Sequence, residues 1–82
     1  MTQVPPLTNP SDVERYLVEM WTEILGVPVN PNDDFFTLGG RSMVAVRMLV
    51  TVMSAYGADI DLDQFFAEPT VRTLARLLGR AG

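Results

Sequence analysis

The sequence contains no histidine, no cysteine and no lysine among its 82 residues. Without cysteine there can be no disulfide and no thiolate metal site, and without histidine the commonest remaining ligand for transition metals is missing. Any metal would have to bind to carboxylates alone, and we expect none. The same absences exclude a Ser-His-Asp mechanism, because no imidazole, thiol or amine side chain is present to activate a serine nucleophile.

Positive charge and long apolar runs are also scarce. Six arginines stand against ten acidic residues, which gives a net charge of -4, the wrong sign for a protein that binds nucleic-acid phosphates. The longest apolar stretch, residues 43–53, is interrupted by Arg47 and Thr51 and is much shorter than the roughly 20 residues that span a bilayer. We find no signal-peptide pattern. We therefore expect a cytoplasmic monomer that binds neither nucleic acid nor membranes.

The overall composition is that of a folded protein. Hydrophobic residues make up 48% of the sequence and charged residues 20%, which is too apolar for a disordered chain. A domain of this length buries only about 60% of the surface of its unfolded form, which leaves little room for a deep catalytic cleft. Residues 1–10 include Pro5 and Pro6 and show no periodicity, so we expect a flexible lead-in followed by a single domain over residues 11–82.

Apolar residues recur at helical spacing after a capping-box pattern formed by Ser11 and Glu14. They predict a first helix that ends at Gly26 and Pro28, and its apolar positions are Val13, Tyr16, Leu17, Met20, Trp21, Ile24 and Leu25. From Gly26 to Arg41 there is no sustained period. A loop of this length is uncommon in a compact domain unless it is packed, and the expected anchors are Phe35, Phe36 and Leu38.

A second helix is expected over residues 42–56, ending at Gly57. It has two apolar stripes, and a helix in so small a protein can rarely bury both. The stripe expected in the core comprises Ala45, Met48, Leu49, Val52, Met53 and Tyr56. The other stripe comprises Met43, Val46, Arg47 and Val50.

The last part of the chain predicts two more helices. A short helical turn is expected between Leu62 and Ala67, and its surrounding apolar anchors are Ile60, Leu62, Phe65 and Phe66. Pro69 ends it, and Thr70 is a suitable N-cap for the last helix, whose apolar face comprises Val71, Leu74, Ala75 and Leu78. We expect Trp21 and Leu74 in the core. The predicted fold class is all-α, a small bundle of three main helices plus one short helix.

The spacing of Asp59, Asp61 and Asp63 is superficially that of a calcium-binding loop. The sixth position of such a loop needs glycine and the twelfth needs glutamate, and these positions hold Gln64 and Thr70. We therefore interpret these carboxylates as a solvated edge between apolar anchors.

Ser42 stands after two glycines and an arginine, where the loop meets the second helix. The hydrolase nucleophile elbow needs glycine two residues after the serine, and this position is Val44. An ordinary N-cap role is the simplest alternative, in which Gly39 and Gly40 form the turn and Ser42 caps the helix.

The string DDFFTLGGRSM resembles the modification motif of the phosphopantetheine carrier proteins, specifically the peptidyl carrier (thiolation) branch of nonribosomal peptide synthesis. The segments WTEILGV and IDLDQFFAEPTVRTLARLL are also similar to that family, so the resemblance covers roughly residues 11 to 80. It implies a helical bundle of the acyl or peptidyl carrier type. It also implies that Ser42 accepts a 4'-phosphopantetheine arm from coenzyme A, with the base supplied by a separate transferase.

The resemblance implies a carrier that is not itself an enzyme. Its expected partners are a phosphopantetheinyl transferase, an adenylation enzyme and later condensation, tailoring or thioesterase enzymes, and its expected cargo is an aminoacyl or peptidyl thioester. The second stripe then becomes a docking surface, made of Arg41, Met43, Val46, Arg47 and Val50. Arg41 stands where the family usually has histidine or aspartate.

Two alternatives stay open. An acyl carrier protein of fatty acid or polyketide synthesis shares the fold and the arm, and a helical interaction module would use Ser42 only as a cap. The methionine at position 1 and the short segment after the last helix lead us to expect a free-standing protein.

Overall fold

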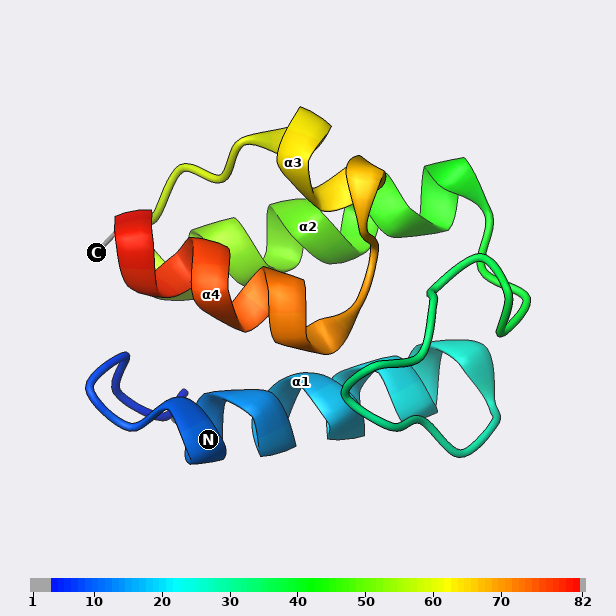
Figure 1. Cartoon of the computed structure of the whole chain (residues 1–82), viewed down its shortest axis with the longest axis horizontal. Coiled ribbons are helices and arrows are strands. Elements are labelled where there is room, and N and C mark those ends of the chain that lie inside the picture. Colours follow the sequence, from blue (N-terminus) through cyan, green and yellow to red (C-terminus); the bar gives the residue numbers. More distant parts are fainter. Residues whose placement is uncertain (1–3, 82) are drawn as a thin grey trace.

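Four α-helices make up the regular structure of residues 4–81, the part of the chain that the computed structural model describes: α1 (Pro10–Leu25), α2 (Ser42–Tyr56), α3 (Leu62–Ala67) and α4 (Val71–Ala81). The all-α class and the pattern of three longer helices plus a short one are as the sequence predicts (Figure 1). In the expected lead-in, residues 1–3 lie outside the described residues and Pro10 already belongs to α1. The flexibility of the rest of that segment stays a prediction.

Helix α1 begins two residues earlier than the capping-box pattern indicates. The N-cap is Asn9, whose side chain accepts a hydrogen bond from the Asp12 N–H. The prediction that Ser11 caps this helix is therefore wrong, and Ser11 lies exposed inside the first turn. Pro10 fits the first helical position because the N–H that it lacks would have no intrahelical partner there.

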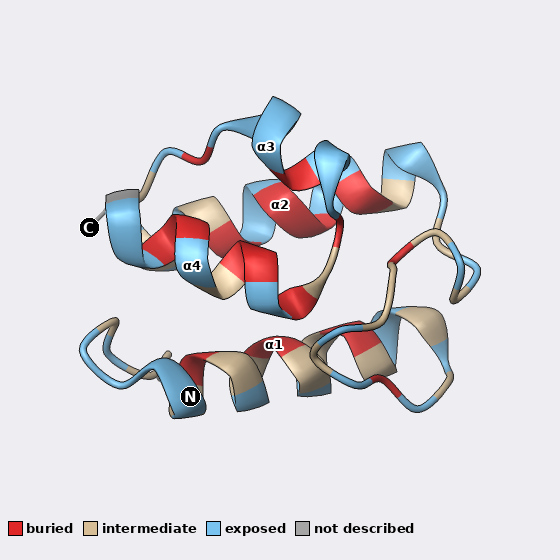
Figure 2. Cartoon of the chain, viewed as in Figure 1, coloured by how far each residue is buried: buried red, intermediate tan, exposed pale blue. Residues whose placement is uncertain are grey.

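The core lies between the facing sides of α1, α2 and α4, where Figure 2 shows the buried residues. Trp21 and Leu74 are fully buried, as predicted. The buried apolar residues are Val13, Leu17, Trp21, Val29, Phe35, Ala45, Met48, Leu49, Val52, Ile60, Phe65, Val71, Leu74, Leu77 and Leu78. Val29 and Leu77 are members of this core that the sequence patterns did not single out.

Three residues expected in the apolar anchors or stripes are exposed instead: Ile24, Leu62 and Phe66. Ile24 is on the correct side of α1, yet 42% of it is exposed. Helical periodicity specifies only the angle of a residue around its helix, and another element must still cover that turn.

The loop between α1 and α2 is packed, as predicted, because it is joined to the start of α4. The Arg72 N–H donates to the Pro31 carbonyl, and the Phe35 N–H donates to the Pro69 carbonyl. Thr70 is the predicted cap of α4, since its hydroxyl oxygen accepts from the Thr73 N–H at 3.1 Å. The middle of this loop, at residues 31 and 35, is thus held against the start of α4.

Candidate functional site

Ser42 is the first residue of α2, and Arg41 occupies the N-cap position with an extended backbone. The interpretation of Ser42 as the N-cap is therefore wrong. Its side chain is exposed, and within residues 4–81 its hydroxyl makes no hydrogen bond that would hold it in place. The hydroxyl is available for chemistry, because it has no structural task at the helix start.

The glycines before Ser42 are required by the fold itself. Gly39 has a φ of 104°, in the region that other residues rarely adopt. A Cβ on Gly40 would collide with the ring of Phe35 and would lie 2.8 Å from the Phe35 carbonyl oxygen. That same carbonyl accepts a hydrogen bond from the Gly40 N–H at 3.0 Å. Gly40 therefore lets the chain close tightly over Phe35 just before Ser42.

Phe35 fixes this turn to the core. Its fully buried ring meets the edge of Trp21 with 4.8 Å between ring centroids. The half-buried Phe36 ring stacks on Phe66 of α3, with centroids 6.0 Å apart. Leu38 is half-buried against the same core. The three predicted anchors thus connect the turn before Ser42 to α1 and α3.

The loop is also closed by hydrogen bonds of its own. One carboxylate oxygen of Asp34 accepts from the N–H groups of Phe36 and Thr37 at 2.8 and 3.1 Å. The Asp34 carbonyl accepts from Leu38, and the Phe36 carbonyl accepts from Gly39. Because these bonds hold the backbone of residues 34–40, they fix the turn that precedes Ser42.

The second stripe of α2 is exposed, as the sequence predicts. The exposed fractions are 71% for Met43, 44% for Val46 and 52% for Val50, and Arg41 and Arg47 are also exposed. The side chains of α2 that are buried lie on the opposite side of the helix. All five predicted docking residues are thus on the surface, four of them close to Ser42 and Val50 further along α2.

A hollow of about 250 Å³ is lined by Ser42, Met43, Val46 and Arg47. Its walls are almost entirely apolar. This hollow brings the predicted attachment residue together with three of the predicted docking residues.

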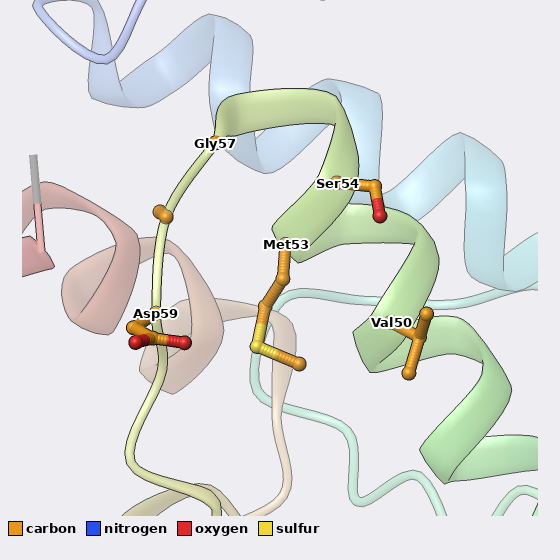
Figure 3. Close-up of a pocket in the computed structure, with 6 residues that line it drawn as sticks. Val50, Met53, Ser54, Gly57 and Asp59 are labelled. Atoms are coloured by element: carbon orange, nitrogen blue, oxygen red, sulfur yellow. The ribbon is translucent and has the colours of Figure 1, made fainter.

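A second hollow, of about 570 Å³, lies at the other end of α2 and was not expected from the sequence. Figure 3 shows Met53 pointing into the space between Val50 and Asp59. The sequence pattern assigned Met53 to the core, but its side chain is half-buried and borders this hollow. In the sequence, the only sign of this half-burial is that Met53 lies on α2 at the border between the core stripe and the exposed stripe.

The electrostatics at Ser42 favour an anion. The first turn of α2 contains no acidic residue, and its N–H groups have no intrahelical acceptors. The N-terminal end of the helix dipole adds to this preference. The site therefore combines a free hydroxyl with a helix start that stabilises an anion. Within residues 4–81, no general base is hydrogen-bonded to the Ser42 hydroxyl.

One of the three aspartates singled out in the sequence, Asp61, has a structural role. The Asp61 carboxylate caps α3 by accepting from the N–H groups of Asp63 and Gln64. Within residues 4–81, no group of three or more acidic residues is arranged to hold a metal ion. None of the helices there is long and apolar enough to cross a membrane.

A family model described as "phosphopantetheine attachment site" matches residues 15–78. Malpibaldin synthetase of Mortierella alpina is 47% identical over 72 residues, which cover 87% of this chain and 1% of that protein. Tyrocidine synthase 2 of Brevibacillus parabrevis is 39% identical over 66 residues, which cover 79% of this chain and 2% of that protein. The chain thus spans only a very small part of the length of these synthetases.

Solved structures show the same likeness over nearly the whole chain. A structure of the phosphopantetheine transferase Sfp in complex with coenzyme A and a peptidyl carrier protein aligns with a TM-score of 0.77 and 31% identity, covering 96% of this chain and 99% of the matched one. The solution structure of an active-site mutant peptidyl carrier protein aligns with a TM-score of 0.78 and 32% identity, covering 99% and 90%. The chain therefore belongs to the phosphopantetheine attachment family, as a carrier domain of the peptidyl carrier type whose cofactor is phosphopantetheine.

Proposed function

We propose that Ser42 is the residue that carries the 4'-phosphopantetheine arm. The observation that carries this proposal is the state of its hydroxyl, which is exposed, has no hydrogen-bonding task in the described residues and stands at the start of α2 after a rigid turn. The chain has two other serines, Ser11 and Ser54, and both lie inside helices. Only Ser42 combines a helix start with the glycine turn that forms part of the family motif.

The residues around Ser42 fit a phosphodiester. Its negative charge would lie at the amino end of α2, where the dipole and the free N–H groups stabilise an anion by about 0.3 to 1 kcal/mol. No acidic residue of the first turn opposes it. The bound arm supplies a thiol, which this chain, with no cysteine, does not have itself.

The proposed task of the armed protein is to carry an aminoacyl or peptidyl thioester in nonribosomal peptide or related natural-product biosynthesis. The names of the relatives, which are peptide synthetases, support a peptidyl cargo over the acyl cargo of fatty acid or polyketide synthesis. Loading with each amino acid, compared with malonyl loading, separates these two classes of cargo. The family resemblance at Ser42 also argues against a simple interaction module.

We propose that the domain is not catalytic and that its partners perform each reaction. A phosphopantetheinyl transferase supplies the base that Ser42 lacks, and adenylation, condensation, tailoring or thioesterase enzymes act on the arm afterwards. The solved complex of a transferase with coenzyme A and a peptidyl carrier protein supports the first of these partners. The cytoplasmic location and the monomeric state expected from the sequence are part of the same proposal.

Intact mass spectrometry tests the attachment site. Incubation with coenzyme A and a broad-specificity transferase should add one phosphopantetheine to the wild type, to Ser11→Ala and to Ser54→Ala, and none to Ser42→Ala. Circular dichroism should show that Ser42→Ala is folded, because its side chain is exposed and makes no contact that the fold needs. Modification of Ser42→Ala would refute the assignment.

A further inference from the structure

Helix α2 presents charge of only one sign around Ser42. Residues 42–56 contain no aspartate or glutamate. Arg47 lines the apolar hollow, and Arg41 directly precedes Ser42, which also lines it. Both arginines are exposed, and neither forms an ion pair within residues 4–81, where the salt bridge recorded is that of Arg72 with Glu14. Because the whole chain has a net charge of -4, this uncompensated positive charge opposes the balance of the molecule.

The charge changes sign toward the other end of the same face. Val50 and Met53 border the second hollow together with Asp59, whose carboxylate lies beside Met53 in Figure 3. Asp59 is exposed and makes no ion pair or side-chain hydrogen bond in the described part of the chain. The exposed face of α2 therefore runs from two free cations near Ser42, over exposed apolar side chains, to a free carboxylate near Gly57.

We propose that this face binds partner enzymes whose surface has the opposite pattern. Such a surface has carboxylates that meet Arg41 and Arg47, an apolar side chain that enters the hollow beside Ser42, and a cationic group or N–H donor that meets Asp59. This inference rests on the proposed function, because the partner is an enzyme that acts on the arm of Ser42.

The pattern also selects one orientation of the partner. A partner turned end for end along α2 would bring its carboxylates to Asp59 and its cation to the two arginines, and like charges placed together oppose binding. The favoured orientation places the acidic edge of the enzyme against Arg41 and Arg47, to the side of Ser42. An acidic docking surface thus distinguishes enzymes that bind this carrier from enzymes whose basic surface binds a carrier with an acidic docking helix.

The test measures how salt changes the rate of loading. Adenylation enzymes are first screened, each with its amino acid, and the probe is the enzyme that charges the armed protein fastest. The measured quantity is kcat/KM for this loading over a series of NaCl concentrations. For the wild type, kcat/KM should fall as salt rises, because attraction between exposed charges is screened over about 10 Å at 0.1 M. The variant Arg41→Glu/Arg47→Glu should lose roughly tenfold or more at low salt and should gain rate as salt rises.

Control variants separate the pattern from the net charge. The single variant Arg47→Glu should also lose rate at low salt. Arg76→Glu makes the same change of charge at an exposed position of α4 that lies outside both hollows of this face, and it should leave the salt dependence unchanged. Asp59→Lys should also lower kcat/KM at low salt, since it removes the negative end of the pattern. Thermal unfolding of each variant should match the wild type, because all four side chains are exposed.

The outcomes distinguish this inference from the proposed function. Each variant is first treated with transferase and coenzyme A, and a wild type that gains no mass at Ser42 would overturn the proposed function and this inference with it. If all variants gain the arm and the wild-type rate is independent of salt or rises with it, the acidic partner alone is wrong. Equal losses of kcat/KM in Arg76→Glu and Arg47→Glu would also overturn the inference of an acidic partner. So would self-association of the wild type that Arg41→Glu/Arg47→Glu abolishes.

Discussion

The position of Ser42 depends on Phe35, whose ring is fully buried. Gly40 closes the turn over the buried ring of Phe35, and a Cβ at this position would meet both that ring and the Phe35 carbonyl. Phe35 in turn packs on Trp21 in the centre of the core. Access for partner enzymes is one reason for a small residue here, and the packing of Phe35 is a second and independent one.

Gly40→Ala should therefore lower the free energy of unfolding by about 1 to 3 kcal/mol, the usual cost of overpacking. Gly79→Ala makes the same chemical change in α4, where an added Cβ meets nothing within 4 Å. Because alanine is the better helix former, the control should gain up to about 1 kcal/mol. Urea titration followed by tryptophan fluorescence measures both, and equal midpoints would contradict the packing argument.

Tyr56 places a hydroxyl in the interior with no hydrogen-bond partner in residues 4–81. Burial raises the pKa of this hydroxyl above 10.0, and the neighbouring Tyr16 adds to the effect. A raised pKa means that the folded protein holds the proton more tightly than the unfolded chain does. The associated stability is fully present below pH 10.0 and is lost as the pH rises through the folded pKa.

Tyr56→Phe should keep the fold and raise the free energy of unfolding by about 1 kcal/mol at neutral pH, since it removes an unpaired buried polar group. It should also remove the part of the alkaline destabilisation that Tyr56 causes. Tyr16→Phe keeps the Tyr56 hydroxyl and removes only the smaller contribution of Tyr16 to its raised pKa, so it should not gain the stability expected of Tyr56→Phe at neutral pH. Thermal melts of both variants and the wild type, at pH 7 and above pH 10.0, measure the difference, and a marked loss of stability in Tyr56→Phe would show that the hydroxyl has a partner.

Helix α4 holds the elements together. It packs on α1 and α3. Its first turn is capped by the Thr70 hydroxyl, and the Arg72 N–H of that turn donates to the Pro31 carbonyl of the long loop. Thr73, in the same turn, is buried, and its hydroxyl donates to the Glu68 carboxylate at 2.8 Å. The much shorter α3 has six residues and buries only Phe65. A helix of that length is not stable alone, so α3 exists because α4 and the Phe35 turn support it.

Leu74→Ala should lower the free energy of unfolding by about 2 to 5 kcal/mol, because it leaves a cavity at a fully buried position of α4. Ile24→Ala removes a side chain of similar size from an exposed position of α1 and should change it by no more than about 0.5 kcal/mol. Denaturant titration compares the two. An unchanged midpoint for Leu74→Ala would mean that α4 docks differently.

The molecule as a whole divides α2 between two tasks. One side of the helix is buried against the rest of the bundle, and the other carries Met43, Val46 and Val50 into the solvent. An exposed apolar strip beside the proposed attachment residue suits brief contacts with several enzymes. The rigid turn and core position Ser42, and the exposed face is the docking surface that we propose for partners.

Val46→Asp should leave thermal unfolding nearly unchanged while it slows aminoacylation of the armed protein, because a carboxylate in the hollow must be desolvated when a partner docks. Ala55→Asp adds the same group to an exposed position of α2 that lies outside both hollows and two turns from Arg47, and it should load at the wild-type rate. Unfolding of Val46→Asp under conditions where Ala55→Asp stays folded would show that Val46 belongs to the core.

Much of the fold could be predicted from local patterns. The bounds of α2 and α3, the Thr70 cap and the burial of Trp21 and Leu74 follow from periodicity, capping chemistry and the glycines and prolines that stop helices. Ser42 could also be singled out as the candidate attachment residue, because its motif is continuous in the sequence. The sequence could not show that Asn9, and not Ser11, is the N-cap of α1, since both residue types are good caps. The hydrogen bond from the Asn9 N–H to the Pro6 carbonyl forms a turn that favours Asn9.

What the tertiary structure added concerns contacts between distant segments. Ile24, Leu62 and Phe66 have the right chemistry for a core but remain exposed, because no other element covers them fully. The collision that excludes a side chain at Gly40, the hollow between Met53 and Asp59 and the joining of Pro31 to Arg72 all depend on where the chain returns upon itself. A local pattern gives the direction of a side chain, and only the packed structure shows what it meets there.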